Sequence, residues 1–438
     1  MEAEAKLLKR IYGPEQSTLN RQLLRYKRMI ERFKRIYPVD NLHIFSVPGR
    51  TELGGNHTDH NNGRVLAAAV NLDSIAAAME NNTDTITVFS DQYEKPFVVS
   101  LDNLDVIKEE CGTTSALIRG VAARLQQLGY QIGGFNASIT SDVLPGSGLS
   151  SSASIEVLIA AIFNGLFNND TIPPHILAMV GQYAENVYYG KPCGLMDQIA
   201  CALGGVLAID FKQADNPQIH KIQFDMENKC CNLLVVNTGG THVDLNEEYA
   251  AIKNEMQTVA RLLGQETLRD VELNEILNNL NFLRRQAGDR AVLRAMHFLE
   301  ENERVIQQAQ ALQEADFKTF LKLVQASGDS SFKWLQNIYS NQDLKNQSLS
   351  LALALTGNYI YQSGLGACRV HGGGFAGTIQ VFLSQKSVQE YIQLMDKIFG
   401  KGSAISLKIR QHGIAHFRYS ELSFFKTEGL DELVGTEN

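Results

Sequence analysis

Residues 144–153 of this chain read LPGSGLSSSA, and they place two glycines and three consecutive serines between two segments of regular apolar spacing. The preceding residues 134–143 alternate apolar and polar side chains as a half-buried strand does, and the apolar residues within 155–163 recur at helical spacing. A glycine-rich turn that opens a helix directs several backbone N–H groups, and the positive end of the helix dipole, toward one point. The stretch therefore predicts a phosphate site, whose serine hydroxyls could also ligate the magnesium ion of a nucleotide. A serine-capped helix start is the alternative for this stretch taken alone.

The length and composition of the chain bound its architecture. A chain of 438 residues is too long for one ordinary hydrophobic core, so we expect two domains. Hydrophobic residues make up 44% and charged residues 20%, which is typical of a folded globular protein and excludes a disordered one. The sequence has no low-complexity linker and no internal repeat, but its composition shifts near residue 230. We therefore place the boundary there, which gives domains at 1–229 and 230–438.

The charge and cysteine patterns indicate which partners are expected and in which cellular compartment the protein works. The formal net charge is −8 and no long basic block is present, so nucleic acid is not an expected partner. The six cysteines show no CxxC spacing, which indicates reduced thiols. The N-terminus lacks the basic-then-apolar order of a signal peptide, and no apolar run approaches the roughly 18 residues of a membrane span. We expect a cytoplasmic, monomeric protein that does not enter membranes.

The order of helix and strand signals indicates an α+β protein with mixed sheets, not a series of regular βαβ units. Apolar periodicity predicts helices over residues 7–36, 114–128 and 151–166, and a mostly helical region from about 247 to 355. Strands are expected over 42–47, 86–89, 135–139, 206–211, 231–237 and 378–383.

Two further segments combine glycines with polar side chains. Residues 48–61, PGRTELGGNHTDHN, follow a predicted strand and read as a polar loop that suits hydrogen bonding to a small polyhydroxylated ligand. A solvated surface turn is the alternative for this loop. Residues 366–377, GACRVHGGGFAG, hold three adjacent glycines that permit close backbone approach to a ligand, although a bulge or tight turn explains them equally well. The chain carries no GxxxxGK(S/T) loop, no GxGxxG and no protein-kinase motif set.

Taken in order, these segments resemble the galactokinase family of the GHMP kinase superfamily. Residues 48–61 look like the galactokinase signature GRxNLIGEHxDYNxG, residues 144–153 like the superfamily's PxGxGLSSSA loop, and residues 366–377 like its GxRxxGxGFGG loop. The resemblance spans about residues 45–383, most of the chain. Shorter matches to the family's GxMDQ, SEY and LRDV segments lie at residues 194–198, 241–249 and 268–271.

The resemblance implies a fold and a reaction. The fold would be the two-domain GHMP kinase fold: an N-terminal α/β domain with a mixed sheet, a C-terminal α+β domain, and the active site in the cleft between them. The reaction would be ATP-dependent phosphorylation of the anomeric (C1) hydroxyl of galactose or a closely related sugar. The products would be the sugar 1-phosphate and ADP, and Mg2+ would be the cofactor.

The catalytic pair implied by the resemblance is Asp197 and Arg50. In the family, an aspartate faces the anomeric hydroxyl and an arginine sits beside it. A neighbouring guanidinium keeps such a carboxylate ionised and can steady the transferring phosphoryl group. Asp197 would accept the hydroxyl proton, or orient the hydroxyl, in a step whose rate depends mostly on positioning and charge neutralisation. A helix-capping carboxylate is the alternative role for this residue.

By the same resemblance, magnesium would be held by Ser151 and Glu185, since a metal that bridges two phosphates needs few, hard oxygen ligands. Spacing alone leaves open whether Ser150, Ser151 or Ser152 is the ligand. The glycines 372–374 would close over the catalytic end of the site. The phosphates would be wrapped by Pro145, Gly146, Ser147, Gly148, Leu149, Ser150, Ser151 and Ser152.

The sugar-facing residues are also carried over from the family, and two positions depart from its pattern. The chain has Asn56 where the signature has Glu, and His60 where it has Tyr. The family's glutamate contacts the sugar near C6, and an amide there removes a negative charge and adds an N–H donor. We therefore expect different specificity at C6, with less repulsion of a C6 carboxylate. The complete sugar-facing set is Asn56, His57, Asp59, Gly194, Asp197 and Tyr249.

Three alternatives to an ordinary galactokinase stay open. One is a kinase for a C6-modified sugar such as galacturonate. Another is a catalytically silent, galactokinase-like sugar sensor, although such proteins tend to disturb the phosphate loop or the region of the aspartate. The last is a kinase of another branch that acts on mevalonate, homoserine or a similar alcohol, against which the pair His57 and Asp59 argues.

Overall fold

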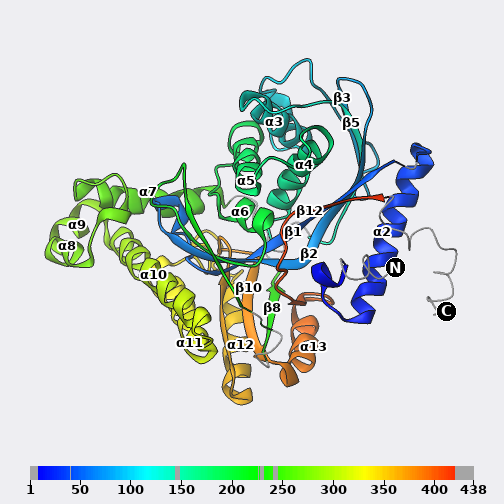
Figure 1. Cartoon of the computed structure of the whole chain (residues 1–438). Helices are drawn as coiled ribbons and strands as arrows, with labels where there is room; N and C mark the ends of the chain where they lie inside the picture. Colours follow the sequence, from blue (N-terminus) through cyan, green and yellow to red (C-terminus); the bar gives the residue numbers. More distant parts are fainter. Residues whose placement is uncertain are drawn as a thin grey trace.

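The computed structural model describes residues 8–39, 41–143, 148–224, 226, 231–239 and 245–419. Its backbone forms two β-sheets with helices packed against them (Figure 1). The mixture of sheets and helices is the α+β architecture that the sequence predicts.

The larger sheet contains the strands on which most of the candidate site is built. Its strands are β1 (His43–Gly54), β2 (Arg64–Glu80), β3 (Thr85–Ser90), β4 (Phe97–Ser100), β5 (Phe135–Ser141), β6 (Val206–Asp210), β7 (Gln218–Ile222) and β12 (Ala415–Arg418). The main path runs β12-β1-β2-β5-β3-β4, and β6 and β7 extend from β2. The β3–β5 pair is parallel and the other described pairs are antiparallel, so the sheet is mixed.

The smaller sheet is antiparallel and comes from the second half of the chain. Its strands are β8 (Cys231–Asn237), β9 (Gly366–His371), β10 (Thr378–Ser384) and β11 (Ala404–Leu407). They lie in the order β11-β8-β10-β9.

The helices divide between the two halves of the chain. They are α2 (Gln16–Ile36), α3 (Thr114–Gln127), α4 (Ser151–Phe167), α5 (Pro174–Tyr183), α6 (Met196–Leu203), α7 (Asn246–Leu262), α8 (Leu273–Asn278), α9 (Leu280–Ala287), α10 (Asp289–Gln313), α11 (Phe317–Ser330), α12 (Ser348–Ser363) and α13 (Val388–Phe399). Within the described ranges, none of the helices is long and apolar enough to span a membrane.

Alternation along the strands sorts side chains into separate cores on the two faces of each sheet. On β1, Phe45 packs under α3–α6, whereas Ile44 faces α2 on the opposite side (Figure 1). On β8, Val235 joins a core with α10 and α11, and Val236 faces α12 and α13. The core around Val235 also holds residues of β1, β2 and β6, such as Leu66, so it joins the two sheets.

The structure confirms most of the predicted elements. The predicted strand 231–237 has the observed bounds of β8, and the predicted helix 151–166 is α4 with one more residue. The predicted helix over 7–36 is interrupted: residues 8–12 are helical, and α2 starts only at Gln16. The break occurs because Gly13 adopts a positive φ of 87° and Pro14 cannot continue the helix.

Two predictions for residues 48–80 were incomplete or wrong. The segment 48–61 is not a loop throughout, since β1 continues to Gly54 with a register shift between Pro48 and Arg50. The whole of β2 was missed, because its alanine-rich sequence is buried on both faces and does not alternate. Both strands are stabilised by neighbours that are distant in the sequence.

A cluster of buried charged side chains links α2 and the segment around Arg410 to β2. Asp73 accepts hydrogen bonds from Arg25 Nη1 at 2.6 Å and from Arg410 Nη1 at 2.9 Å, and the side chains of Asp73 and Arg410 are fully buried. Tyr12 and Ser46 also donate to this carboxylate. Burial alone would raise the pKa of Asp73, but the two guanidinium groups and these hydroxyls hold it below its ordinary value.

The chain's last described strand returns to the first sheet. β12 pairs with β1, with Arg418 opposite His43, whereas β8 opens the second sheet at Cys231. The proposed domains 1–229 and 230–438 therefore share a sheet near the end of the chain, and their boundary stays a prediction.

Candidate active site

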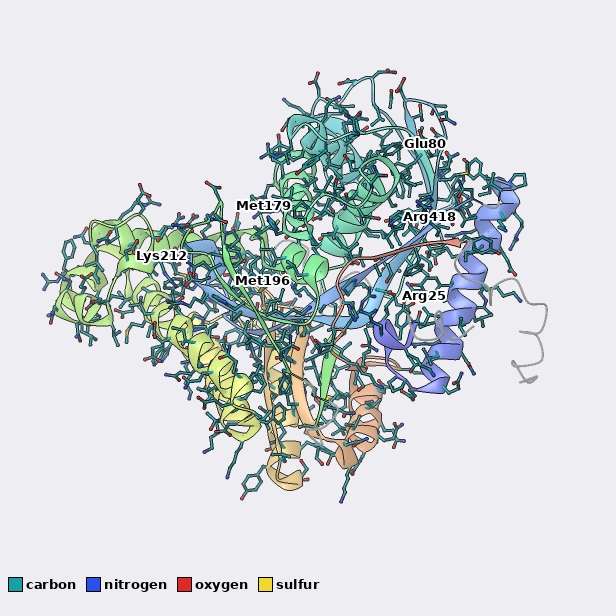
Figure 2. All side chains as sticks on the ribbon, in the orientation of Figure 1. Arg25, Glu80, Met179, Met196, Lys212 and Arg418 are labelled. Carbon is teal, nitrogen blue, oxygen red and sulfur yellow. The ribbon has the colours of Figure 1, made fainter. Side chains whose placement is uncertain are left out.

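Arg50 and Asp197 form the central ion pair of the site. Arg50 lies on β1 and Asp197 in the first turn of α6, next to Met196, which is labelled in Figure 2. Arg50 donates through Nε to Asp197 Oδ1 at 2.6 Å and through Nη2 to Oδ2 at 2.7 Å. This two-point geometry holds both planar groups in one orientation. Asp197 keeps 29% of its side chain exposed, against 7% for Arg50, so the carboxylate remains accessible to a ligand.

The surroundings of Asp197 keep it ionised. Burial by itself would raise its pKa, but the charge and hydrogen bonds of Arg50, and a hydrogen bond from Ser150, hold the pKa below its ordinary value. At neutral pH the group is therefore a carboxylate that accepts hydrogen bonds and protons.

The start of α4 approaches this pair closely. Arg50 donates from its backbone N–H to Leu149 O at 3.1 Å and from Nη1 to Gly148 O at 2.5 Å. Gly148 and Ser150 have positive φ values of 72° and 59°, and Ser150 immediately precedes the helix. A left-handed serine is uncommon, and such strain often marks a functional site.

The predicted phosphate loop is only partly within the described residues. Pro145, Gly146 and Ser147 lie outside them, as does Leu144. The described part, from Gly148 to Ser152, leads into the N-terminus of a helix of 17 residues, as the sequence predicts.

A second carboxylate, Glu185, lies beside the serines at the start of α4. It belongs to the π-helical turn η3 (Ala184–Tyr189), and only 3% of its side chain is exposed. Ser152 Oγ donates to Glu185 Oε1 at 3.1 Å, and Lys191 Nζ donates to the same oxygen at 3.2 Å. Gln198, which follows Asp197, donates to the other oxygen at 3.1 Å. The hydroxyl that meets Glu185 is thus that of Ser152, while the hydroxyl of Ser150 bonds Asp197.

A second buried acid, Glu156, shares the hydrogen-bond donor Gln198 with Glu185. Gln198 Nε2 also donates to Glu156 Oε2 at 2.9 Å, and Glu156 is fully buried. Burial, and then the neighbouring charge of Glu185, raise the pKa of Glu156 well above its ordinary value. Burial and the neighbouring carboxylate thus favour the neutral form of Glu156 over its charged form.

Asp59 and Gly194, two of the predicted sugar-facing residues, are in contact. A Cβ on Gly194 would lie 1.8 Å from Asp59 Oδ2, so only glycine lets the carboxylate approach. Gly194 lies three residues before Asp197, and the contact brings the end of the sugar signature to the start of α6.

The glycines 372–374 meet His57 and Tyr249. His57 Nε2 lies 2.8 Å from Gly373 O, and Tyr249 donates to Gly374 O at 2.9 Å. Burial, and then the charge of the neighbouring His60, lower the pKa of His57 to about 3. His57 is therefore neutral near pH 7, with one N–H donor and one acceptor nitrogen.

Asn56 lies deeper than the other predicted sugar contacts. It is fully buried, and its amide nitrogen donates to Glu52 Oε1 at 3.1 Å and to Gly372 O at 2.7 Å. Its amide oxygen accepts from Asn337 at 2.8 Å and from Ser331 at 3.3 Å. Both donor hydrogens and both acceptor positions are thus used within the protein. The contact of Asn56 with a sugar stays a prediction.

Glu52 is the residue that reasoning from the sequence missed. The family signature has Asn at this position and Glu at position 56, so this chain exchanges the two residue types. Glu52 is buried and accepts a hydrogen bond from Arg369, whose side chain is fully buried on β9. Burial raises the pKa of Glu52, and the charges of Arg369 and Arg50 oppose that rise. The exchange is visible in residues 48–61 and could have been found by comparing every position with the signature.

Two family models match the segments that supply these residues. The model for the N-terminal domain of GHMP kinases matches residues 116–205, which include α4, Glu185 and Asp197. The model for the galactose-binding signature of galactokinases matches residues 31–80, which include Arg50 and the segment 56–60.

Known proteins of the same kind match most of the chain. A galactokinase of Lacticaseibacillus casei is 27% identical over 363 residues, which is 82% of this chain and 89% of that protein. The solved structure of Lactococcus lactis galactokinase complexed with galactose has a TM-score of 0.75 at 22% identity and covers 88% of this chain and 98% of its own. A mevalonate kinase of Methanococcus jannaschii has a TM-score of 0.59 at 18% identity and covers 84% of this chain and 98% of its own.

The match of residues 116–205 to the GHMP kinase model and the similarity to solved GHMP kinases show that the chain has the GHMP kinase fold. Within that superfamily the signature at residues 31–80 and the curated relatives are more specific. The chain carries the galactose-binding signature of galactokinases, resembles curated galactokinases over most of its length, and is a sugar kinase, a phosphotransferase.

Proposed function

We propose that this protein transfers the terminal phosphoryl group of ATP to the anomeric (C1) hydroxyl of galactose or a closely related sugar, with the sugar 1-phosphate and ADP as products. The observation that carries the proposal is the Arg50–Asp197 pair, which lies directly against the N-terminus of α4. An ionised carboxylate beside a helix start is the arrangement that a hydroxyl acceptor and a phosphoryl donor require.

The residues divide the work of such a reaction. Asp197 accepts a hydrogen bond from the sugar hydroxyl. It takes up the hydroxyl proton as the hydroxyl oxygen bonds the terminal phosphorus of ATP and the bond from that phosphorus to ADP breaks. Arg50 holds the carboxylate in place and supplies positive charge next to the transferring group. The backbone N–H groups at the start of α4 face the phosphates. Because phosphoryl transfer has a loose transition state, this positioning and charge neutralisation supply most of the rate.

The donor set at Glu185 suits a magnesium ion. Ser152 Oγ and Glu185 Oε1 lie 3.1 Å apart, and both are hard oxygen ligands. When bound, Mg2+ would neutralise charge on the phosphates. The geometry favours Ser152 over Ser151, which the family resemblance implied, as the serine ligand.

Replacing Ser152 with alanine should therefore raise the Mg2+ concentration for half-maximal activity by at least about tenfold, since a ligand is lost. Ser151→Ala is the matched control and should change that concentration by less than about threefold. The measurement is initial rate against free Mg2+ at fixed ATP and sugar. The opposite order of the two variants would return the ligand role to Ser151.

We also propose that the site tolerates a modified C6. Glu52 pairs with Arg369, and Asn56 replaces the signature's glutamate and bonds Glu52. The carboxylate that the signature places at position 56 is thus replaced by one at position 52, whose charge is balanced by Arg369. A C6 carboxylate would meet less negative charge here than in a protein that follows the signature.

The test is a panel of galactose, galacturonate, N-acetylgalactosamine, mevalonate and homoserine with ATP, followed by ADP release. Phosphorus–proton coupling in the NMR spectrum of the product identifies the phosphorylated carbon. We expect anomeric phosphates, and kcat/KM for galacturonate within about tenfold of that for galactose. A strong preference for galactose would contradict the C6 proposal alone. Turnover with none of the sugars would contradict the proposed reaction and favour a silent sensor.

We keep three further proposals about the whole molecule. The chain would consist of domains at 1–229 and 230–438, act as a monomer, and work in the cytoplasm. Cys111, Cys193, Cys201 and Cys368 are free thiols, which suits a reducing compartment. Size-exclusion chromatography with light scattering tests the oligomeric state.

A further inference from the structure

Lys191 and Ser152 approach the same oxygen of Glu185. Lys191 follows η3 by two residues, and its Nζ lies 3.2 Å from Glu185 Oε1, while Ser152 Oγ lies 3.1 Å from that atom. The other oxygen of Glu185 is held by Gln198. The oxygen proposed for the metal is thus the one that the ammonium group occupies.

The burial of Glu185 explains why a cation is needed there. Only 3% of its side chain is exposed, and a buried carboxylate without a counter-charge is costly. Arg50 does not serve this purpose, because both ends of its fork are used on Asp197. Lys191 supplies the charge from a side chain that is 63% exposed, so its ammonium can move into water when another cation takes its place beside the carboxylate.

We propose that Lys191 is the resident counter-ion of Glu185, displaced when magnesium arrives with the nucleotide, and that it sets the metal requirement of the site. The inference rests on the proposed role of Glu185 as a metal ligand. Without metal, the ammonium shields the triphosphate from a bare carboxylate. When Mg2+ binds, the ammonium of Lys191 must leave Glu185 Oε1. The ammonium and Mg2+ therefore compete for this oxygen.

Replacing Lys191 with methionine, which keeps the length of the side chain, should move two binding quantities in opposite directions. The probe is AMP-PNP, measured by titration calorimetry on the full chain, first with EDTA and then across a range of Mg2+. Without metal, the Kd of AMP-PNP should rise roughly two- to fivefold, the size expected for an exposed ion pair. The Mg2+ concentration that gives half of the metal-dependent gain in affinity should fall by about the same factor.

Two further variants control this experiment. Lys191→Arg keeps the charge and should restore both quantities to near the parental values. Lys212→Met removes a lysine of equal exposure, 63%, whose ion pair with Asp270 is 3.4 Å long. Lys212 is labelled well apart from Met196 in Figure 2. This variant should change neither quantity.

A cycle with Glu185→Gln separates the two proposals. If Lys191 acts through Glu185, Lys191→Met should have no effect on either quantity in the Glu185→Gln background. If Glu185→Gln leaves the Mg2+ dependence of binding as in the parent, the proposed metal site is wrong. If Glu185→Gln changes that dependence while Lys191→Met changes neither quantity, or shifts both toward weaker binding, only the counter-ion role is overturned.

Discussion

Asp197→Asn should lower kcat by about 10²- to 10⁴-fold, the range expected when a positioned general base is removed. The amide has nearly the same shape as the carboxylate, so Arg50 and Ser150 keep a neighbour of the same size. It cannot take up the proton of the sugar hydroxyl, and the negative charge that orients the Arg50 fork is lost. AMP-PNP should still bind with a Kd within about threefold of the parent, because the phosphate-binding residues are unchanged.

The control for this variant is another partly exposed, ion-paired aspartate. Asp170 accepts from His416 at 2.8 Å and belongs to no part of the proposed site. Asp170→Asn should leave kcat near the parental value. If Asp197→Asn kept most of its turnover, Asp197 would not be the proton acceptor, and the pair with Arg50 would be structural.

The second large effect concerns stability. Arg410→Met should lower the free energy of unfolding by about 3–5 kcal/mol, because it leaves the fully buried Asp73 without one of its two guanidinium partners. Arg410 also donates to Ser46 Oγ at 2.8 Å and to Gly413 O at 2.8 Å, and these acceptors would lose their donor as well. Urea denaturation followed by circular dichroism measures the change.

An exposed ion pair gives the matched control for Arg410. Arg284 and Asp289 are joined at 2.6 Å, but their side chains are 53% and 66% exposed. Arg284→Met should therefore cost less than about 1 kcal/mol. Equal losses in the two variants would contradict the role assigned to burial.

The Asp73 cluster also sets a direction for the pH dependence of stability. Because the pKa of Asp73 is lowered in the folded protein, its contribution is fully present above the unfolded value of about 3.9. The contribution is lost as the pH falls through the folded pKa. Asp73→Asn should make stability less sensitive to pH in this acidic range.

The parts of the site that the sequence predicted are those that depend on local order. The serines at 150–152 follow a turn and open a helix with apolar spacing, and α4 starts at Ser151 as predicted. Asp197, Glu185 and Arg50 were assigned by their place in motifs, and the structure brings Arg50 and Asp197 into contact. Turn, helix and motif patterns are carried by residues close together in the sequence, so they can be recognised without knowledge of the fold.

Contacts between distant segments could not be predicted in this way. Residues 48–61 read as a polar ligand-binding loop or a solvated turn, yet 48–54 continue the buried strand β1 because the second sheet supplies partners for them. Gln380 donates to Thr51 Oγ1 at 2.7 Å and to Glu52 O at 2.9 Å from more than 300 residues away. A polar side chain can be buried when its hydrogen bonds are satisfied, and the sequence does not show which partners will arrive.

The sequence by itself determined the fold class and the resemblance to sugar kinases, and it predicted Asp197 and Arg50 as the catalytic pair, because turn chemistry, helical periodicity and motif order are encoded within short segments. The tertiary structure alone decided that Ser152 meets Glu185, that Lys191 shares its oxygen, and that Asn56 is held by Glu52 and the glycines 372–374. These outcomes depend on which side chains converge once β1, α4, α6 and the second sheet pack together. Convergence of that kind is a property of packing and hydrogen-bond satisfaction across the whole fold, which local residue patterns do not specify.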